Sequence, residues 1–221
     1  QLEEGTVVAI AAKIVSLCEG RAIPMDAVDK DELIAQESSW YLPRTSSRYN
    51  VSFTITRNML IPTAGIDESN ANDHYILWPK DVQESANRIR KHLQEKYKLK
   101  NLGVIITDST TRPMQWGTTG IAVAFSGFKP LKDYIGTDDI FGRTMQFQKS
   151  NIANGLAAAA VLLMGEGSEQ TPLCVISDLS FIEFQDNDPT AAELESLIIA
   201  PEDDLYAPFL TAVDWQKGQA S

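Results

Sequence analysis

The chain has 221 residues, of which 43% are hydrophobic and 22% are charged, and it carries a formal net charge of -11 with a pI of about 4.6. This composition is typical of a soluble globular protein long enough for one large domain or two small ones. The acidic balance argues against a nucleic-acid partner, because such a surface repels phosphate backbones. No apolar run approaches the roughly 20 residues of a membrane helix, and no signal peptide opens the chain. We therefore expect a cytoplasmic protein with no membrane partner.

The cysteine and histidine content limits the metals that the chain could bind. The two cysteines, Cys18 and Cys174, lie in apolar contexts without a CxxC partner, so we expect buried free thiols in a reducing compartment. The two histidines, His74 and His92, argue against a zinc site. A metal would instead be held by carboxylate, hydroxyl, carbonyl or water oxygens, which favours Mg²⁺ or Mn²⁺.

The amino-terminal part is expected to contain short strands and one acidic helix. Residues 6–10 predict a buried, β-branched strand, and residues 11–16 continue its apolar run but include one charged residue, Lys13. A lysine at the end of a buried strand can pair with phosphate as a point charge, or it can extend its stem so that the ammonium reaches water. The pattern then predicts, in order, a helix over 29–37, a loop over 38–49 and a half-buried strand over 51–56.

A second apolar run, over 59–62, leads to Asp67, Ser69 and Asn70. Aspartate and asparagine side chains bond to nearby backbone amides, so this segment taken alone favours a turn rather than a ligand site. Beyond it, apolar residues recur every three or four positions over 81–98, which predicts an amphipathic helix packed on a sheet.

The chain is organised around residues 102–113. Four β-rich apolar residues lead into Asp108 and Ser109 and then into Arg112. The apolar run predicts a buried strand with Asp108 at its carboxyl end. An aspartate there can hold a metal or ligand at the rim of the sheet, or it can cap the following turn, and this stretch alone favours the cap.

The remaining elements alternate irregularly, with few βαβ units, which favours an α+β fold with mixed sheets and packed helices. We expect a single domain over 1–221, with two interwoven subdomains as the alternative. The expected elements are a strand or a pair of strands over 117–127, turns over 129–143, a helix over 152–164 that ends at Gly165, a polar loop over 165–172, a buried strand over 173–176 and a helix over 190–197.

Three carboxylates therefore stand beside hydroxyl, amide or glycine residues. Asp67 and Asp108 follow apolar runs, and Glu166 lies in a glycine-flanked loop after a helix. Carboxylates at such positions, without His or Cys, fit a divalent cation that bridges phosphates. The alternative, three independent turn acids, stays open on the pattern alone.

Several motifs, in order along nearly the whole chain, resemble the coenzyme F-420 γ-glutamyl ligase family, which includes γ-glutamate ligases of folate metabolism. These motifs are KIVSLCEGR (13–21), AGIDESN (64–70), GVIITDSTTRP (103–113), DIFGR (139–143), LAAAAVLLMGE (156–166) and APEDDLY (200–206), together with Gly117 to Gly120 and Pro130 to Tyr134.

The resemblance implies a fold, a reaction and a set of site residues. Members of the family have a γ-glutamyl ligase-like α+β fold in an intertwined homodimer, and they join the α-amino group of L-glutamate to an acceptor carboxylate through an acyl phosphate. They use GTP with Mg²⁺ or Mn²⁺ and a monovalent cation such as K⁺. By matching position, the metal ligands would be Asp67, Asp108 and Ser109, with Glu166 as a further contact. The nucleotide would be bound by Lys13, Asn70 and a loop made of Gly165, Glu166, Gly167, Ser168, Glu169 and Gln170. Asp67, Asp108 and Arg112 would serve catalysis, and Arg112 would act with Lys13 to offset charge on the phosphates.

The chain also departs from the pattern of that family. Ser109 stands where the family usually has threonine, and Phe125 where it usually has glycine. Gln148-Lys149 replaces a usual Thr-acid or Thr-Arg pair, and Asn154-Gly155 replaces a usual Asp-Glu pair. The family's first strand and a nucleotide-contacting turn would precede Gln1, so we expect an upstream segment to be missing. A second hypothesis follows, in which a catalytically altered homologue binds a nucleotide or a pterin- or deazaflavin-like ligand without ligation.

Overall fold

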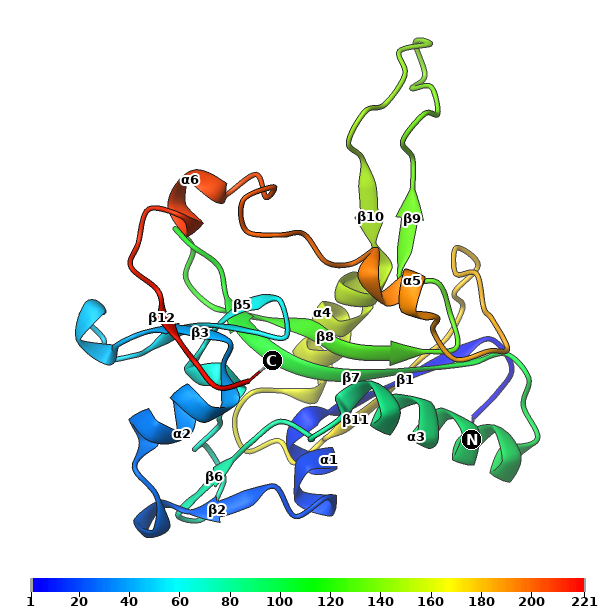
Figure 1. Cartoon of the computed structure of the whole chain (residues 1–221). Coiled ribbons are helices and arrows are strands. Elements are labelled where there is room, and N and C mark those ends of the chain that lie inside the picture. Colours follow the sequence, from blue (N-terminus) through cyan, green and yellow to red (C-terminus); the bar gives the residue numbers. More distant parts are fainter. Residues whose placement is uncertain (1, 221) are drawn as a thin grey trace. The chain divides into compact units, whose positions relative to one another are not determined.

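A four-stranded sheet in the order β11-β1-β7-β8 supports the first of two units into which the chain divides (Figure 1). This unit comprises Gln1–Ala12 and Asp81–Pro189, and the computed structural model describes residues 2–220 of the chain. Strand β1 runs parallel to β7, whereas β11 and β8 are antiparallel to their neighbours. The strands are β1 (Thr6–Ala11), β7 (Leu102–Thr111), β8 (Thr118–Ser126) and β11 (Leu173–Ile176). Mixed sheets with helices confirm the α+β class.

Both faces of this sheet are covered at its centre. Ile105 and Ile106 are consecutive residues of β7 and both are 0% exposed, which requires burial on the two faces of the strand. Helices α3 (Val82–Tyr97) and α4 (Ile152–Met164) both pack against β7 and β8. The predicted buried strand and the predicted amphipathic helix are therefore confirmed.

Polar caps fix the ends of these two helices. Asp81 accepts a hydrogen bond from the Glu84 amide at 2.9 Å at the start of α3, and Asn151 accepts one from the Asn154 amide at 2.9 Å at the start of α4. Helix α4 ends at Gly165, whose φ of 82° is accessible to glycine without steric cost. The predicted boundaries over 81–98 and 152–164 are thus confirmed to within a residue or two.

Two predictions about strand ends are wrong. Asp108 lies inside β7, paired with Ile121, because antiparallel pairing with β8 continues beyond the apolar run to Thr111. Residues 11–16 do not extend the first strand, since helix α1 (Ala12–Cys18) begins directly after β1. Lys13 therefore lies in the first turn of a helix.

Two predictions about burial are also wrong. Strand β11 forms one edge of the sheet, so Leu173 and Val175 are 53% and 51% exposed instead of buried. Cys18 is exposed and Cys174 is partly exposed, although both thiols are free as expected. An apolar sequence context does not distinguish an edge strand from a central one.

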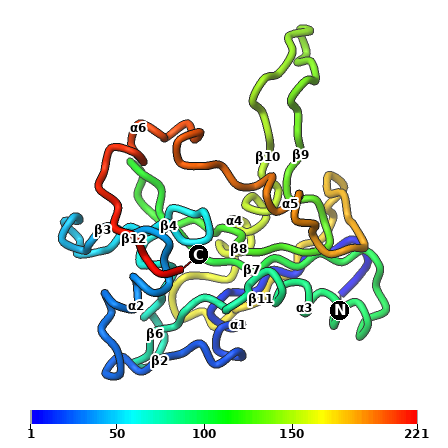
Figure 2. Tube along the Cα trace, in the orientation of Figure 1, coloured from blue at the N-terminus to red at the C-terminus, as the bar shows by residue number. Residues whose placement is uncertain are grey.

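The first unit also carries an arm made of β9 (Leu131–Asp133) and β10 (Lys149–Asn151), which pair antiparallel. Figure 2 traces the segment between them as a long, narrow excursion of the chain, where only turns are expected from the sequence. Ile140, Phe141 and Phe147 of this segment are 92%, 89% and 92% exposed. Apolar side chains so exposed are typical of a surface that contacts a partner.

The second unit comprises Lys13–Lys80 and Thr190–Ser221 and contains two antiparallel sheets, in the orders β12-β3-β4-β5 and β2-β6. Its strands are β2 (Ala22–Pro24), β3 (Trp40–Leu42), β4 (Phe53–Thr56), β5 (Met59–Pro62), β6 (His74–Ile76) and β12 (Gln216–Lys217). Its helices, besides most of α1, are α2 (Lys30–Glu37), α5 (Ala191–Glu195) and α6 (Ala207–Leu210). The helix over 29–37 and the strand over 51–56 are confirmed, whereas the loop prediction over 38–49 is wrong where β3 lies.

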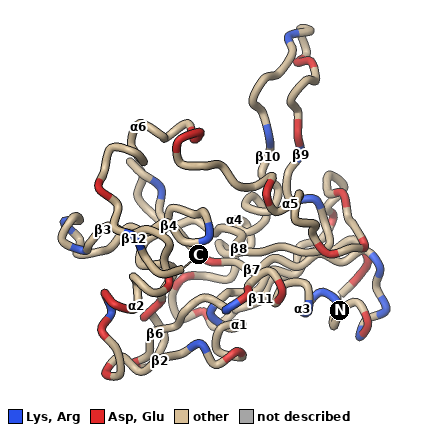
Figure 3. Tube along the Cα trace, viewed as in Figure 1, with Lys and Arg blue, Asp and Glu red and all other residues tan. Residues whose placement is uncertain are grey.

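Within residues 2–220, no helix combines the length and the apolar character that crossing a bilayer requires. Charged positions are spread over both units but are absent from some elements (Figure 3). The arm and helices α2 and α3 carry Lys, Arg, Asp or Glu, whereas strand β8 and helix α4 carry none.

The contact between α4 and β8 depends on a small residue at position 120. A Cβ atom on Gly120 would overlap the Ala157 carbonyl oxygen and would lie 2.7 Å from the Val161 Cβ. We expect Gly120→Ala to destabilise the protein by about 1–3 kcal/mol, because it overpacks this contact. Urea unfolding measures the change.

Gly155 provides the matched control. It lies in α4, and a Cβ atom added to it would meet nothing within 4 Å, so Gly155→Ala should stabilise the helix by about 0.5–1 kcal/mol. Equal unfolding midpoints for Gly120→Ala and the unchanged protein would contradict the packing argument.

Candidate functional site

Ser109, Thr118 and Glu166 form a polar cluster in the first unit. The Ser109 hydroxyl donates a hydrogen bond to Glu166 Oε2 at 3.2 Å, and the Thr118 hydroxyl donates one to Oε1 at 3.2 Å. One carboxylate therefore bridges two hydroxyl groups from neighbouring strands. Ser109 and Glu166, both predicted metal ligands, are brought together, whereas Thr118 was not among the predicted site residues.

The register of the sheet explains this cluster. Ser109 pairs with Gly120, and Thr118 lies two residues from Gly120, so the Ser109 and Thr118 side chains project from the same face. Gly120 contacts α4 on that face, and α4 leads directly into the loop that carries Glu166. Only the pairing register identifies Thr118, which is why the sequence alone gives no signal for it.

Asp108 precedes Ser109 in β7, so its side chain projects from the opposite face of the strand. Its Oδ1 atom accepts a hydrogen bond from the Ser109 amide at 2.8 Å, and the residue is only partly buried. The structure therefore places the two neighbouring predicted ligands on different sides of β7. The Asp108 carboxylate and the Ser109 hydroxyl therefore do not form a preformed pair of metal ligands.

Asp67 and Lys13 form the corresponding cluster of the second unit. Lys13 Nζ lies 2.7 Å from Asp67 Oδ2 and donates to the Ser69 carbonyl oxygen at 2.5 Å. Asp67 Oδ1 accepts hydrogen bonds from the Ser69 amide and the Ser69 hydroxyl, both at 2.7 Å. A predicted nucleotide contact and a predicted metal ligand are thus in direct contact.

These contacts keep Asp67 ionised. Burial alone would raise the pKa of the Asp67 carboxyl, but the hydrogen bonds from Lys13 and Ser69 outweigh burial, and the pKa is lowered from its ordinary value. The backbone of Asp67 is held as well, since its amide donates to the Ile76 carbonyl oxygen at 2.9 Å and its carbonyl oxygen accepts from the Ile76 amide at 2.8 Å. A fixed, anionic carboxylate is suited to bind a cation.

An unusual turn precedes Asp67. Thr63, Ala64 and Gly65 have φ values of 53°, 55° and 73°, so three consecutive residues are left-handed. The left-handed conformation costs about 1–2 kcal/mol for each residue that carries a Cβ. Gly65 is required for a further reason, since a Cβ there would lie 2.6 Å from Trp78 Nε1. Backbone strain of this kind concentrates at functional sites.

The neighbouring predicted nucleotide contacts are exposed. Asn70 is exposed with a φ of 51°, and Glu68 beside it pairs with Lys30. In the loop after α4, Gly165 is partly exposed and the other predicted residues are exposed, and these are Glu166, Gly167, Ser168, Glu169 and Gln170. Within that loop the Gly167 amide donates to Glu169 Oε2 at 2.8 Å, so Glu169 folds back over its own loop.

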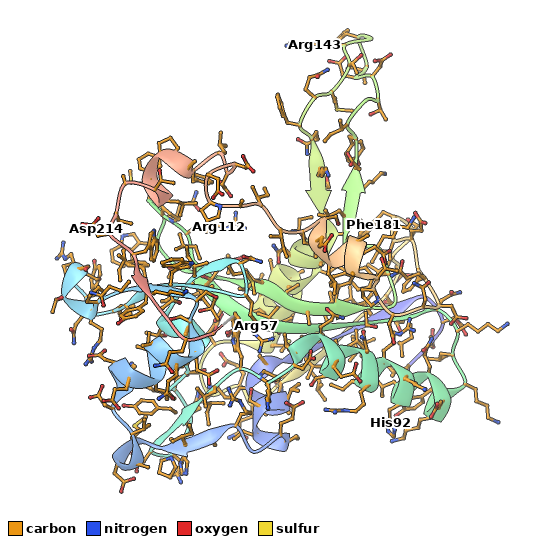
Figure 4. All side chains as sticks on the ribbon, viewed as in Figure 1. Arg57, His92, Arg112, Arg143, Phe181 and Asp214 are labelled. Carbon is orange, nitrogen blue, oxygen red and sulfur yellow. The ribbon has the colours of Figure 1, made fainter. Side chains whose placement is uncertain are left out.

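Arg112 lies exposed in the connection between β7 and β8, in the same hairpin that carries Asp108 and Ser109 (Figure 4). Trp116 of this connection is 95% exposed and Met114 is fully exposed. An exposed guanidinium at the end of this hairpin is accessible to an anionic ligand.

The donor set fits a hard divalent cation. Within residues 2–220, no three His, Cys, Asp or Glu side chains gather into a group that could hold a metal. Glu166 instead meets the hydroxyls of Ser109 and Thr118, while Asp108 lies on the other face of β7 and Asp67 meets Lys13 and Ser69 in the second unit. Oxygen ligands of these types suit Mg²⁺ or Mn²⁺, particularly when phosphate and water complete the coordination.

The residues that depart from the family pattern have structural contacts. Asn154 Oδ1 accepts a hydrogen bond from the Ala122 amide at 2.9 Å, beside the irregularity in the pairing of β7 with β8. Phe125 is buried in the core, 5.7 Å from Phe128 between ring centroids. Lys149 pairs with Asp133 across the arm at 3.3 Å. These substitutions thus serve packing and strand pairing.

The sequence of the chain is similar to that of a known protein family. A family model described as F420-0:γ-glutamyl ligase matches residues 1–178, a range that contains every predicted metal and nucleotide residue. A coenzyme F420:L-glutamate ligase of Methanopyrus kandleri is 34% identical over 200 residues, which are 81% of this chain and 77% of that protein.

Two further relatives carry the same name. The coenzyme F420:L-glutamate ligase of Methanosarcina mazei is 33% identical over 195 residues, covering 81% of this chain and 76% of the relative. The one of Methanothermobacter thermautotrophicus is 35% identical over 193 residues, covering 79% of this chain and 75% of the relative. The similarity is therefore spread over most of both sequences in each case.

The Lys13–Asp67 contact predicts a change in acid titration. Because the Asp67 pKa is lowered on folding, its contribution to stability is present above the unfolded value of about 3.8 and is lost as pH falls through the folded value. We expect Lys13→Met to raise the Asp67 pKa and to reduce the loss of stability on acidification below about pH 4. Carbon-13 NMR titration of the carboxyl group measures the pKa.

Lys30→Met is the matched control, because Lys30 pairs with Glu68 and not with Asp67. An Asp67 pKa that is the same in Lys13→Met as in the unchanged protein would mean that the ion pair does not form in solution.

Proposed function

Since the chain belongs to the F420-0:γ-glutamyl ligase family, whose enzymes form C–N bonds with glutamate, we propose that it uses GTP and a divalent cation to join L-glutamate to an acceptor carboxylate. The acceptor would be a coenzyme F-420-like or folate-like molecule. The observation that carries the metal assignment is the Ser109–Glu166–Thr118 cluster together with the ionised Asp67 held by Lys13. Both present oxygen ligands on the motifs that define the family resemblance.

The reaction would proceed by activation of a carboxylate. The acceptor carboxylate attacks the γ-phosphorus of GTP, the bond to the β-γ bridging oxygen breaks, and GDP leaves. The amine of L-glutamate then attacks the carbonyl carbon of the acyl phosphate, phosphate leaves with the bonding electrons, and the amine loses a proton. A bound Mg²⁺ or Mn²⁺ would neutralise phosphate charge, which otherwise repels the anionic nucleophile.

The residues of this chain would bind and orient the reactants. Asp67 in the second unit and Asp108 in the first would each serve as a metal ligand, and Ser109 with Glu166 would supply a second group of oxygen ligands. The opposite orientation of Asp108 and Ser109 along β7 supports two separate ligand groups. Lys13 and Arg112 would offset the charge that develops on the transferred phosphate.

The nucleotide would lie along the loop that follows α4. Its glycines at 165 and 167 have no side chains that would block a ligand, and Lys13 and Asn70 are the other residues proposed to contact the nucleotide. A monovalent cation such as K⁺ would complete the charge balance at the phosphates. Exclusion of water is needed to protect the acyl phosphate from hydrolysis.

A non-ligating binder is the second candidate, and the Asn154-Gly155 substitution favours it. Where the family usually has an acid, Asn154 accepts a hydrogen bond from the Ala122 amide, so this position supports strand β8. Calorimetry with GTP and Mn²⁺, followed by a phosphate-release assay with glutamate and candidate acceptors, separates the two functions. Release that requires glutamate supports the ligase, and binding without release supports the binder.

The metal assignment predicts the behaviour of an Asp108 variant. We expect Asp108→Asn to reduce Mn²⁺-dependent GDP release by more than about 100-fold, since removal of a direct ligand should exceed the effect of losing an outer partner. Asp186→Asn, at an exposed acid of the same unit, should leave the rate unchanged. Circular dichroism establishes that both variants are folded, and full activity of Asp108→Asn would refute the assignment.

The exposed arm supports the proposed homodimer. Ile140, Phe141 and Phe147 expose apolar surface that a second copy of the chain could cover. We expect light scattering to give a mass of about twice the 24.4 kDa of the chain. Replacement of all three residues by serine should shift the mass toward the monomer, and a monomeric starting protein would rule out the dimer.

A further inference from the structure

Thr54 carries a fully buried hydroxyl beside the turn that precedes Asp67. Its side chain is 0% exposed, and its Oγ1 atom donates to the Ile61 carbonyl oxygen at 2.8 Å. The same atom accepts a hydrogen bond from the Ala64 amide at 3.0 Å and one from the Thr56 hydroxyl at 3.3 Å. The single proton and both lone pairs of this hydroxyl are therefore used.

The Ala64 amide belongs to the middle residue of the left-handed turn. On either side of it, the Thr63 amide donates to the Ser52 carbonyl oxygen at 2.9 Å, and the Ile66 amide donates to the Thr63 carbonyl oxygen at 2.9 Å. Ala64 is 2% exposed, so water cannot replace Thr54 as the partner of its amide without a rearrangement. A strained backbone persists only where surrounding contacts over-determine it.

The turn determines the position of the Asp67 backbone. Two residues separate Ala64 from Asp67, and the backbone of Asp67 is then fixed by its two hydrogen bonds to Ile76. A change in the turn would move Asp67 relative to Lys13, whose ammonium lies 2.7 Å from the carboxylate. The buried Thr54 hydroxyl is thus linked to the Asp67 carboxylate through the Ala64 amide and the two residues that follow it.

We propose that Thr54 is a positioning residue for Asp67, which acts through the Ala64 amide and does not touch the cation or the nucleotide. The assignment of a cation to Asp67 is part of the proposed function, and the positioning inference rests on it. The sequence gives no signal for this role, because Thr54 is one alternating residue of a half-buried strand.

The test compares Thr54→Val, which removes the hydroxyl at nearly constant volume, with Thr54→Ser, which keeps it. We expect Thr54→Val to weaken Mn²⁺ binding in the presence of GTP by about 10- to 100-fold, the range found for outer partners of metal ligands. Thr54→Ser should bind Mn²⁺ nearly as the unchanged protein does. Electron paramagnetic resonance of free Mn²⁺ measures the binding in both.

Ser38→Ala controls for the loss of a buried hydroxyl in the same unit. Ser38 is 0% exposed and donates to the Ile34 carbonyl oxygen at 2.7 Å, a hydrogen bond at the end of helix α2 that involves no atom of the turn. We expect it to lower stability without weakening Mn²⁺ binding. Equal weakening by Ser38→Ala and Thr54→Val would overturn the inference, since general destabilisation would then explain both.

Two further measurements separate this inference from the proposed function. In Thr54→Val we expect faster hydrogen exchange of the Ala64 amide and changed chemical shifts of the Asp67 backbone amide, both independent of any metal. If Asp67→Asn binds Mn²⁺ normally, the metal role of Asp67 fails, and these two measurements still decide whether Thr54 positions it. Unchanged exchange and unchanged Asp67 shifts in Thr54→Val would refute the positioning role.

A folding defect in Thr54→Val also has a defined outcome. Thr63→Gly removes the left-handed penalty at a β-branched residue, so Thr54→Val/Thr63→Gly should recover the fold and part of the Mn²⁺ binding. Failure of the double variant to fold would assign Thr54 to general core stability and would overturn the inference.

Discussion

Antiparallel pairing of β7 with β8 beyond the apolar core is the constraint on which the first unit's site depends. The apolar run of β7 ends at Ile106, yet pairing continues to Thr111. This extension carries Ser109 and Thr118 onto one face of the sheet, where Glu166 can bridge their hydroxyls. Hydrogen bonding in the sheet therefore continues where hydrophobic burial stops, and the polar residues gathered there are available for ligands.

The second unit also holds a carboxylate in a fixed position, but it does so with a turn and not with the pairing of two long strands. Its carboxylate lies after a strained turn that buried contacts stabilise, and Lys13 and Ser69 keep that carboxylate ionised. Both arrangements hold polar oxygen atoms in fixed orientations. Groups that are already oriented need little reorganisation when a charged ligand binds.

The sequence pattern was enough to predict those helices whose ends are marked by capping residues nearby in the sequence. The helices over 81–98 and 152–164 have periodic apolar faces and polar or glycine caps, so their boundaries were predictable. Asp108 was misplaced because the end of β7 depends on its partner strand, and β11 was predicted to be buried because edge and central strands share the same composition. Thr118 and Thr54 were not predicted, since their roles follow from register and from a turn whose conformation only Gly65 suggests.

The central claim, which follows from the proposed function, is that Asp67 and Asp108 each serve as a ligand of a divalent cation that accompanies the nucleotide. Crystals grown with Mn²⁺ and a non-hydrolysable GTP analogue, with diffraction recorded at the manganese edge, test it most directly. For each aspartate we expect manganese about 2.1 Å from a carboxylate oxygen, a distance usual for small hard cations. A nucleotide bound with Mn²⁺ located away from both aspartates would contradict the claim.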